Sequence, residues 1–232
     1  MGFARSFRRQ MKKTKEVTAK KRRRALLEPL EPRILLDAEM TFSMAGAVND
    51  LTLCLDNVDG IETLHLIDNQ DQSLDTQVIM SQALLETTGI KITGSDQGDD
   101  LTIDFNTPFS VPNGILFTDA FDGDGDNLKV AGKASVWNIL GGNGGNVDGA
   151  GVLDFFGIEN LTGSAEADTF VIEAGGSLDG VVDGGEGADS LEGADTDNTW
   201  EITALDAGAL NEQIFENIEN LIGGEDQDTF VL

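Results

Sequence analysis

Large apolar residues recur at steps of nine through the second half of the chain. The pairs and triplets spaced in this way are Ile92 and Leu101, Leu128 and Trp137, Leu161 and Phe170, Val182 with Leu191 and Trp200, and Leu221 and Phe230. Glycine, aspartate, asparagine and serine fill the intervals, and glycine supplies the positive φ angles of tight turns. One strand and one turn cannot bury an apolar residue alone, so successive copies must stack. The pattern predicts an all-β protein, a parallel β-solenoid of the β-roll or β-helix kind, with these residues in buried layers.

Longer repeats divide the same part of the chain. The segment 160–171, Asn-Leu-Thr-Gly-Ser-Ala-Glu-Ala-Asp-Thr-Phe-Val, recurs at 220–231 as Asn-Leu-Ile-Gly-Gly-Glu-Asp-Gln-Asp-Thr-Phe-Val. We therefore expect repeat units of roughly 60–70 residues, one at 90–157 and one at 158–217. A third unit opens at 218–232, so we expect the chain to be part of a longer protein.

The region before the repeats, residues 39–89, has a different pattern. Apolar and polar residues alternate over 50–56 and 62–68, which is typical of an antiparallel hairpin. Such a hairpin can cap the first layer of the solenoid and keep its edge from pairing with other chains. A β-sandwich of antiparallel hairpins is the competing fold, and it suits residues 50–80 better than it suits the repeats.

Charge is distributed very unevenly. Residues 1–33 contain 12 of the 15 lysines and arginines, whereas the remaining chain contains three (Lys91, Lys129 and Lys133) against 39 acidic residues. A field of this sign repels nucleic acid and anionic membranes, and it destabilises a compact state unless cations neutralise it. A solvated acidic coat, or an adaptation to high salt, is the alternative to a bound cation. The concentration of aspartates in glycine-rich turns favours the bound cation.

The clearest of these turns is Gly184-Gly-Glu-Gly-Ala-Asp-Ser-Leu191, which matches the G-G-x-G-x-D-x-U repeat of calcium-binding RTX proteins. Calcium takes six to eight oxygen ligands at about 2.3–2.6 Å. Glycines let the carbonyl groups of a turn converge, and the aspartate adds a charged ligand. The candidate calcium ligands are Gly184, Gly185, Gly187 and Asp189 in this turn, Asp179, Asp195 and Asp197 beside it, and Asp99, Asp122, Asp124, Asp126, Asp168, Asp226 and Asp228 in related turns.

Turns on one edge of such a roll would be 18 residues apart, which predicts that Asp179 pairs with Asp195 or Asp197. We expect one to three sites of modest affinity. The alternative is that the aspartates and glycines only satisfy turn geometry through local hydrogen bonds. Residues 122–126 begin like an EF-hand loop, but Lys133 stands where the closing glutamate belongs, so no EF-hand is predicted.

Two stretches resemble a known group of proteins. Leu30-Glu-Pro-Arg-Ile-Leu-Leu-Asp-Ala38 resembles the LEPR-XLL motif near the start of very large repetitive bacterial proteins. The repeats, with Glu-Asn-Leu-x-Gly followed by Asp-Thr-Phe, are similar to those of adhesin-like members of that group. The resemblance implies that residues 1–38 are a basic tail with a sorting motif. It also implies export without a Sec signal, by a type I system, and display at the cell surface in adhesion or biofilm.

Other function classes find little support in the sequence. Cys54 and His65 are the single cysteine and histidine, so they predict a buried thiol and a strand residue rather than catalysis, and we expect no enzyme. No apolar run is long enough for a membrane span, and the basic head, which we expect to be disordered, is not followed by a secretory apolar segment. The predicted function is a calcium-binding structural or adhesive repeat region of a secreted or cell-surface protein, with calcium, export machinery and surface ligands as partners and no nucleic acid. The alternative is the non-catalytic leading part of a secreted RTX-type protease or lipase.

Overall fold

The computed structural model describes residues 38–46, 49–71, 77–119, 123, 125–149 and 151–232. The chain divides into two units, Met1–Ile34 and Leu35–Leu232, and all the described residues belong to the second. The predicted basic tail and nearly all of the motif at 30–38 therefore lie outside the described residues. The described part is all-β; its single helical element is a 3₁₀ turn, η1 (Leu84–Glu86). None of its helices is long and apolar enough to cross a membrane.

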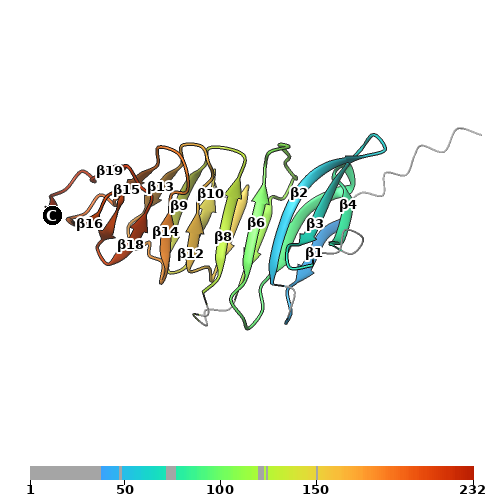
Figure 1. Cartoon of the computed structure of the whole chain (residues 1–232), viewed down its shortest axis with the longest axis horizontal. Helices are drawn as coiled ribbons and strands as arrows, with labels where there is room; N and C mark the ends of the chain where they lie inside the picture. Colours follow the sequence, from blue (N-terminus) through green and yellow to red (C-terminus); the bar gives the residue numbers. More distant parts are fainter. Residues whose placement is uncertain (1–37, 47–48, 72–76, 120–122, 124, 150) are drawn as a thin grey trace, which may run out of the picture. The chain divides into compact units, whose positions relative to one another are not determined.

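Two sheets, both mostly parallel, contain the described strands (Figure 1). The nine-stranded sheet has the order β1 (Ala38–Ser43), β5 (Thr87–Thr93), β7 (Ile115–Thr118), β11 (Leu153–Phe156), β10 (Gly144–Val147), β9 (Val136–Gly141), β13 (Thr169–Ile172), β15 (Ser190–Glu192) and β19 (Asn220–Ile222). The eleven-stranded sheet has the order β20 (Asp228–Val231), β16 (Asn198–Ala204), β17 (Ala207–Leu210), β18 (Gln213–Glu216), β14 (Val181–Asp183), β12 (Asn160–Thr162), β8 (Asn127–Ala131), β6 (Asp100–Asp104), β2 (Asp50–Val58), β3 (Ile61–Asp68) and β4 (Val78–Ala83).

The nine-residue step of the sequence carries the chain from one sheet to the other. Val182, Leu191 and Trp200 lie in β14, β15 and β16, which belong alternately to the eleven-, nine- and eleven-stranded sheets. Because the parallel strands of a sheet point the same way, turns that leave the nine-stranded sheet share one edge, here called the outbound edge. Turns that leave the eleven-stranded sheet share the other, the return edge. This arrangement is consistent with the solenoid-like fold that the apolar spacing predicts.

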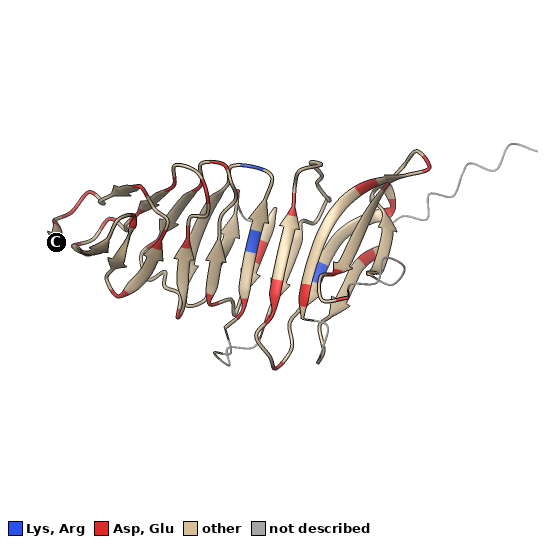
Figure 2. Cartoon of the chain, viewed as in Figure 1, with Lys and Arg blue, Asp and Glu red and all other residues tan. Residues whose placement is uncertain are grey.

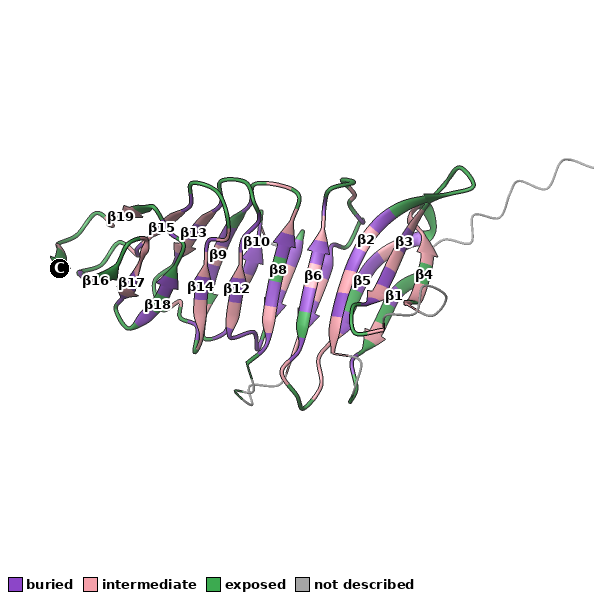
Figure 3. Cartoon of the chain, viewed as in Figure 1, coloured by how far each residue is buried: buried purple, intermediate pink, exposed green. Residues whose placement is uncertain are grey.

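The core lies between the sheets and consists of apolar residues in register. Leu128 of β8 is paired with Leu101 on one side and Leu161 on the other, and all three are fully buried. In the other sheet Trp137 stacks on Phe170 with ring centroids 5.4 Å apart. Neighbouring strand positions point outward and are polar, so buried and partly exposed residues alternate along the strands (Figure 3). The predicted buried layers are thus confirmed over most of their length.

The last layer is an exception. Phe230 is 52% exposed and Leu221 is only partly buried, so the prediction that Phe230 is buried was wrong. These residues belong to β20 and β19, the terminal strands of the two sheets, and each strand therefore has a neighbour on one side only. Phe230 still stacks on Trp200 with ring centroids 5.7 Å apart, so the layering itself persists.

Each tryptophan lies in the first strand of a three-stranded antiparallel meander, which the nine-residue pattern did not predict. Trp137 opens the meander β9–β10–β11 and Trp200 opens β16–β17–β18. A meander keeps the chain in one sheet for three strands. As a result, each repeat makes an odd number of crossings, and corresponding residues of successive repeats fall in opposite sheets. Phe170 lies in the nine-stranded sheet, whereas its counterpart Phe230 lies in the eleven-stranded sheet.

The antiparallel hairpin expected before the repeats is present. Strands β2 and β3 pair over their whole length around the turn Asp59–Gly60, in which both residues have positive φ. Two such residues form the turn that matches the twist of paired strands. The hairpin, followed by β4, closes one end of the eleven-stranded sheet.

Candidate metal centre

Many of the turns between the sheets have six residues, with glycine first and aspartate last. In the turn 163–168, Asp168 folds back over its own turn. Its Oδ2 accepts hydrogen bonds from the backbone N–H of Ser164 (2.6 Å) and from the Ser164 hydroxyl (2.9 Å). Its Oδ1 accepts a third bond from the backbone N–H of Ser135, in the previous layer, at 2.6 Å. A single carboxylate thus closes one turn and binds it to the next.

Carboxylates of this kind form one column along each edge. The outbound column consists of Asp99, Asp126 and Glu159. The backbone N–H of Asp99 donates to Asp126 Oδ1 (2.8 Å), and that of Asp126 donates to Glu159 Oε2 (3.0 Å).

The return column consists of Asp168, Asp189 and Glu219. The backbone N–H of Asp168 donates to Asp189 Oδ1 (2.7 Å), and that of Asp189 donates to Glu219 Oε2 (2.6 Å). Bonds to an ionised acceptor are stronger than neutral ones. Carboxylates of both columns therefore satisfy the geometry of the turns through hydrogen bonds.

The glycines of the RTX-like turn are explained by the close stacking of turns. A Cβ on Gly184 would lie 2.0 Å from the carbonyl oxygen of Asn217, and one on Gly163 would lie 2.2 Å from the carbonyl oxygen of Gly184. Gly187 has φ of 142°, which other residues rarely adopt. Column partners are 21 and 30 residues apart on the return edge and 27 and 33 on the outbound edge, so the predicted spacing of 18 was wrong. Meanders and longer turns lengthen the path between layers.

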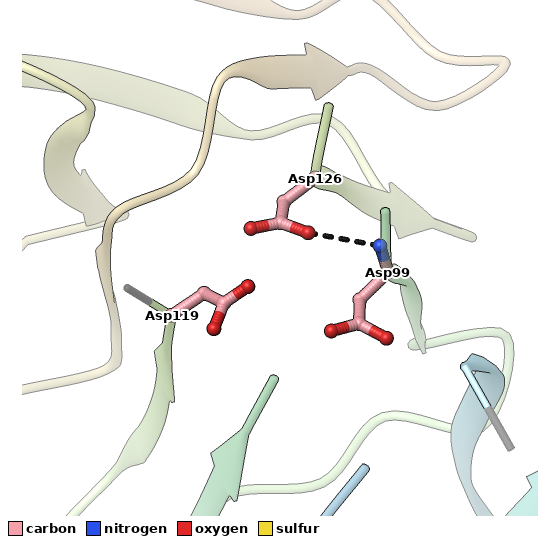
Figure 4. Close-up of side chains that lie close together, drawn as sticks. All are labelled: Asp99, Asp119 and Asp126. Atoms are coloured by element: carbon pink, nitrogen blue, oxygen red, sulfur yellow. Dashed lines mark hydrogen bonds between the residues drawn. The ribbon is translucent and has the colours of Figure 1, made fainter. Parts of the chain in front are cut away.

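Three carboxylates converge on the outbound edge. Oxygen atoms of Asp99, Asp119 and Asp126 all lie within 4.8 Å of one another, and the three side chains face a common space (Figure 4). Asp99 and Asp126 are fully buried, and Asp119 is partly buried. They come from two adjacent turns of the outbound edge, one after β5 and one after β7.

A glycine makes room for this cluster. Thr93 and Thr118 are paired in β5 and β7, so the next residues, Gly94 and Asp119, occupy corresponding positions. A Cβ on Gly94 would lie 2.6 Å from Asp119 Cγ and 2.7 Å from Asp99 Oδ2. The absence of a side chain at residue 94 therefore lets the two carboxylates approach.

The cluster can hold a metal ion. Its ligands are exclusively carboxylate oxygens, which suit hard divalent cations. Burial of several like charges is unfavourable unless a cation compensates them.

Sequence reasoning identified two of the three ligands. Asp99 and Asp126 were predicted and are brought together, whereas Asp119 was missed. The signal that marks Asp119 is the pairing of Thr118-Asp119 with Thr93-Gly94, which places an aspartate where the neighbouring layer has glycine. Asp122 and Asp124 lie outside the described residues.

Asp179 does not meet Asp195 or Asp197. It lines a cavity of about 510 Å³ on the outbound edge and accepts a hydrogen bond from Asn143 (3.0 Å). Asp195 and Asp197 instead accept bonds from the backbone N–H groups of Glu225 (3.0 Å) and Gln227 (3.2 Å). Strands β17 and β18 lie between β14 and β16, which separates the turns that the sequence pairs.

The remaining predicted residues have separate surroundings. Asp226 is exposed, and Asp228 accepts a hydrogen bond from Asn198 (2.9 Å). Asp189 is fully buried, and its Oδ2 has no hydrogen-bond partner among the described residues. Burial raises the pKa of Asp189 to about 6, helped by the nearby charges of Asp168, Glu219 and Asp183. Burial also raises the pKa of Asp168, against the hydrogen bonds it accepts.

In comparisons with known proteins, no family model, no curated protein and no solved structure matches this chain. The resemblances in its motifs therefore remain expectations from the sequence.

Proposed function

We propose that this chain is a calcium-binding structural repeat region of a secreted or cell-surface protein. The observation that carries the proposal is the group of Asp99, Asp119 and Asp126, whose oxygens lie within 4.8 Å of one another between two stacked turns. Calcium accepts several carboxylates together with backbone carbonyls in an irregular geometry. Two adjacent turns that contribute three carboxylates suit such an ion.

The charge of the whole unit supports a divalent cation. Acidic residues lie along strand ends and turns throughout the unit, and very few basic ones accompany them (Figure 2). Of these few, Lys133 forms a salt bridge with Asp148 and lies over the ring of Phe105. A divalent ion bound between turns neutralises repulsion locally, whereas monovalent salt only screens it diffusely.

Neutralisation by a bound divalent ion would give the acidic repeats a physical role. In a calcium-poor cytosol the acidic unit would remain weakly stable and pliant, and it would become rigid on export into a calcium-rich medium. A rigid, repetitive spacer of this kind suits a surface adhesin, which is the role that the LEPR-XLL and RTX-like motifs imply. Partners at the surface would then be contacted by other parts of such a protein.

Thermal unfolding in calcium tests the proposal. The full chain is melted in EDTA, in millimolar calcium, and in sodium chloride of matched ionic strength. A ligand at a hundredfold excess over its Kd adds about 2.7 kcal/mol per site, so calcium should raise the midpoint by about 5–10 °C, since 1 kcal/mol corresponds to about 2–4 °C in a domain of this size. Equal effects of calcium and sodium chloride would show that the turns hold no specific ion.

Two single-charge variants identify the site. Asp119→Asn removes one cluster carboxylate and should abolish most of the calcium-specific rise in midpoint. Asp96→Asn removes one negative charge from the same turn as Asp99, but Asp96 is exposed and outside the cluster. The Asp96 variant should therefore keep the full calcium response. Equal losses in the two variants would mean that net charge, rather than a site, governs the response.

A further inference from the structure

The outer face of the meander β9–β10–β11 contains a trough that is separate from the carboxylate columns. Ile139 and Phe155 are fully buried in the core. Because side chains alternate along a strand, the next residues, Leu140 of β9 and Phe156 of β11, point to solvent and are 52% and 57% exposed. Strand β10 lies between these strands, so two strand spacings, about 9–10 Å, separate their backbones. Leu140 and Phe156 are the walls of a trough of about 500 Å³, a size typical of ligand pockets.

Glycines keep this trough open, although the backbone does not require them. Gly141, Gly142 and Gly144 line it, and none of the three has positive φ. A Cβ on Gly141 or Gly142 would meet no atom within 4 Å. A Cβ on Gly144 would lie 3.5 Å from the Phe156 ring, which is an ordinary van der Waals contact. Glycine without a structural need costs conformational entropy on folding, so these three positions indicate a space that side chains would fill.

Two polar side chains add hydrogen-bonding groups to the trough. Asn146 of β10 lies opposite Asp154 of β11, and both line the trough. Asn146 is only 6% exposed. Its Oδ1 accepts a hydrogen bond from Asn138 (3.0 Å), whereas its Nδ2 donates none to a described residue. The two oxygens of Asp154 share one donor, the backbone N–H of Gly151 (3.1 Å from each), and a carboxylate can accept more bonds than this. A ligand in the trough would meet an unused donor beside an acceptor.

We propose that the trough binds a neutral sugar residue of a glycan. A hydroxyl group both donates and accepts, so sugar hydroxyls can accept from Asn146 and donate to Asp154. The face of an aromatic ring carries partial negative charge, which suits contact between the Phe156 ring and the C–H groups of a pyranose. The negative field of the unit repels anionic ligands. Lysine and arginine side chains offer donors only, so a basic ligand would leave the Asn146 amide unpaired.

The inference goes beyond the proposed structural role, because it gives this region a ligand of its own. That ligand would be additional to the surface partners contacted by other parts of a longer protein. The trough shares no residue with the cluster of Asp99, Asp119 and Asp126. Sugar binding and calcium binding can therefore fail separately.

An NMR titration of the full chain tests the inference. The probes are neutral oligosaccharides of glucose, galactose, mannose and N-acetylglucosamine, with polygalacturonate as an anionic comparison and hexalysine as a basic one. At least one neutral oligosaccharide should shift the side-chain amide resonances of Asn146, and the two charged probes should leave them unchanged. Failure of all four oligosaccharides would overturn the inference, and so would a shift caused by hexalysine alone.

Variants locate the binding to the trough. Gly144→Val places a side chain on its floor, and valine suits a strand, so melting should be normal. Affinity should fall at least about tenfold, the lower limit for one excess methylene in a pocket. Asn146→Ala should lower affinity about five- to tenfold, as expected for loss of one hydrogen bond. Undiminished binding by Gly144→Val would refute the site.

Controls keep the test decisive. Phe156→Ala should also weaken binding, whereas Leu205→Ala should not, because Leu205 is 88% exposed and lies outside the trough. Equal affinities of these two alanine variants would contradict the inference even if Gly144→Val failed to fold. Asp119→Asn should bind the oligosaccharide normally, which separates this site from the proposed calcium site.

Discussion

The two carboxylate columns have the same backbone arrangement but different chemistry. In both, a carboxylate accepts a hydrogen bond from the backbone N–H of the preceding column member. Among the described residues, only the outbound column has an additional carboxylate close to two of its members. This is Asp119, whose carboxylate lies within 4.8 Å of those of Asp99 and Asp126. The comparison separates two roles of acidic residues in this fold. One carboxylate per turn serves the backbone, and an additional one creates a cation site.

The presence of the Asp119 carboxylate depends on one difference between the sequences of neighbouring layers. Position 119 corresponds to Gly94 in the neighbouring layer, and Gly94 leaves the space that Asp119 occupies. In the return column the corresponding space is closed. A Cβ on Gly163 would lie 2.2 Å from a backbone carbonyl oxygen, and a Cβ on Gly184 would lie 2.0 Å from another. A third side chain cannot enter there. The return column is therefore expected to be structural, and three predictions test the contrast.

The largest effect is expected from Asp168→Ala. This change removes the acceptor of three donors, the N–H groups of Ser135 and Ser164 and the Ser164 hydroxyl. Each buried donor left unpaired costs about 1–3 kcal/mol, and the loss of a buried charge offsets part of this. We expect a net destabilisation of about 3 kcal/mol in urea unfolding, equal with and without calcium. A loss no greater than that of Asp96→Ala would mean that the column does not hold the turns together.

An intermediate effect is expected from Asp126→Asn, and it should depend on calcium. The asparagine oxygen can still accept the bond from the N–H of Asp99, and one charge fewer relieves repulsion within the cluster. Stability in EDTA should therefore be unchanged or slightly higher, whereas most of the roughly 2.7 kcal/mol from calcium should be lost.

The matched variant in the other column is Asp168→Asn. It should lower stability in EDTA and leave the calcium increment intact. If the two asparagine variants behave alike in calcium, the distinction between the columns fails.

The smallest effect concerns Asp189 and pH. Its pKa is raised from 3.8 to about 6, so the folded state binds the proton more tightly than the unfolded state. The favourable contribution of this group is complete below about pH 4 and is lost as pH rises through 6. In Asp189→Asn the oxygen that accepts the Asp168 N–H is retained and no charge forms.

The variant should therefore be more stable than the unmodified chain at pH 7 in EDTA, by about 2–4 °C, which is the shift produced by 1 kcal/mol in a domain of this size. At pH 4 the two should melt together. Melting curves between pH 4 and 8 measure the difference, and a gap that does not grow with pH would show that Asp189 does not titrate in this range.

Apolar spacing in the sequence was sufficient to predict an all-β fold and the parallel strands that contain the spaced residues, but not the antiparallel strands of the two meanders. A step of nine residues, as from Leu161 to Phe170, contains one short strand and one six-residue turn, and only the burial of successive apolar residues against one another satisfies it. Glycine and aspartate at fixed places in the turns likewise predicted where carboxylates would gather. Two of the three cluster residues, Asp99 and Asp126, were identified in this way.

Which of these carboxylates meet was decided by the tertiary structure alone. The antiparallel meanders opened by Trp137 and Trp200 shift successive repeats to opposite sheets, so turns with similar sequences do not stack on the same edge. Strands β17 and β18, inserted between β14 and β16, separate Asp179 from Asp195, and the layering places Asp119 beside Asp99. Strand pairing likewise brings Cys54 to His65. Sequence periodicity specifies the nine-residue step from one strand to the next. Contacts between layers depend instead on the number of residues and strands that separate two layers, and each inserted strand changes that number.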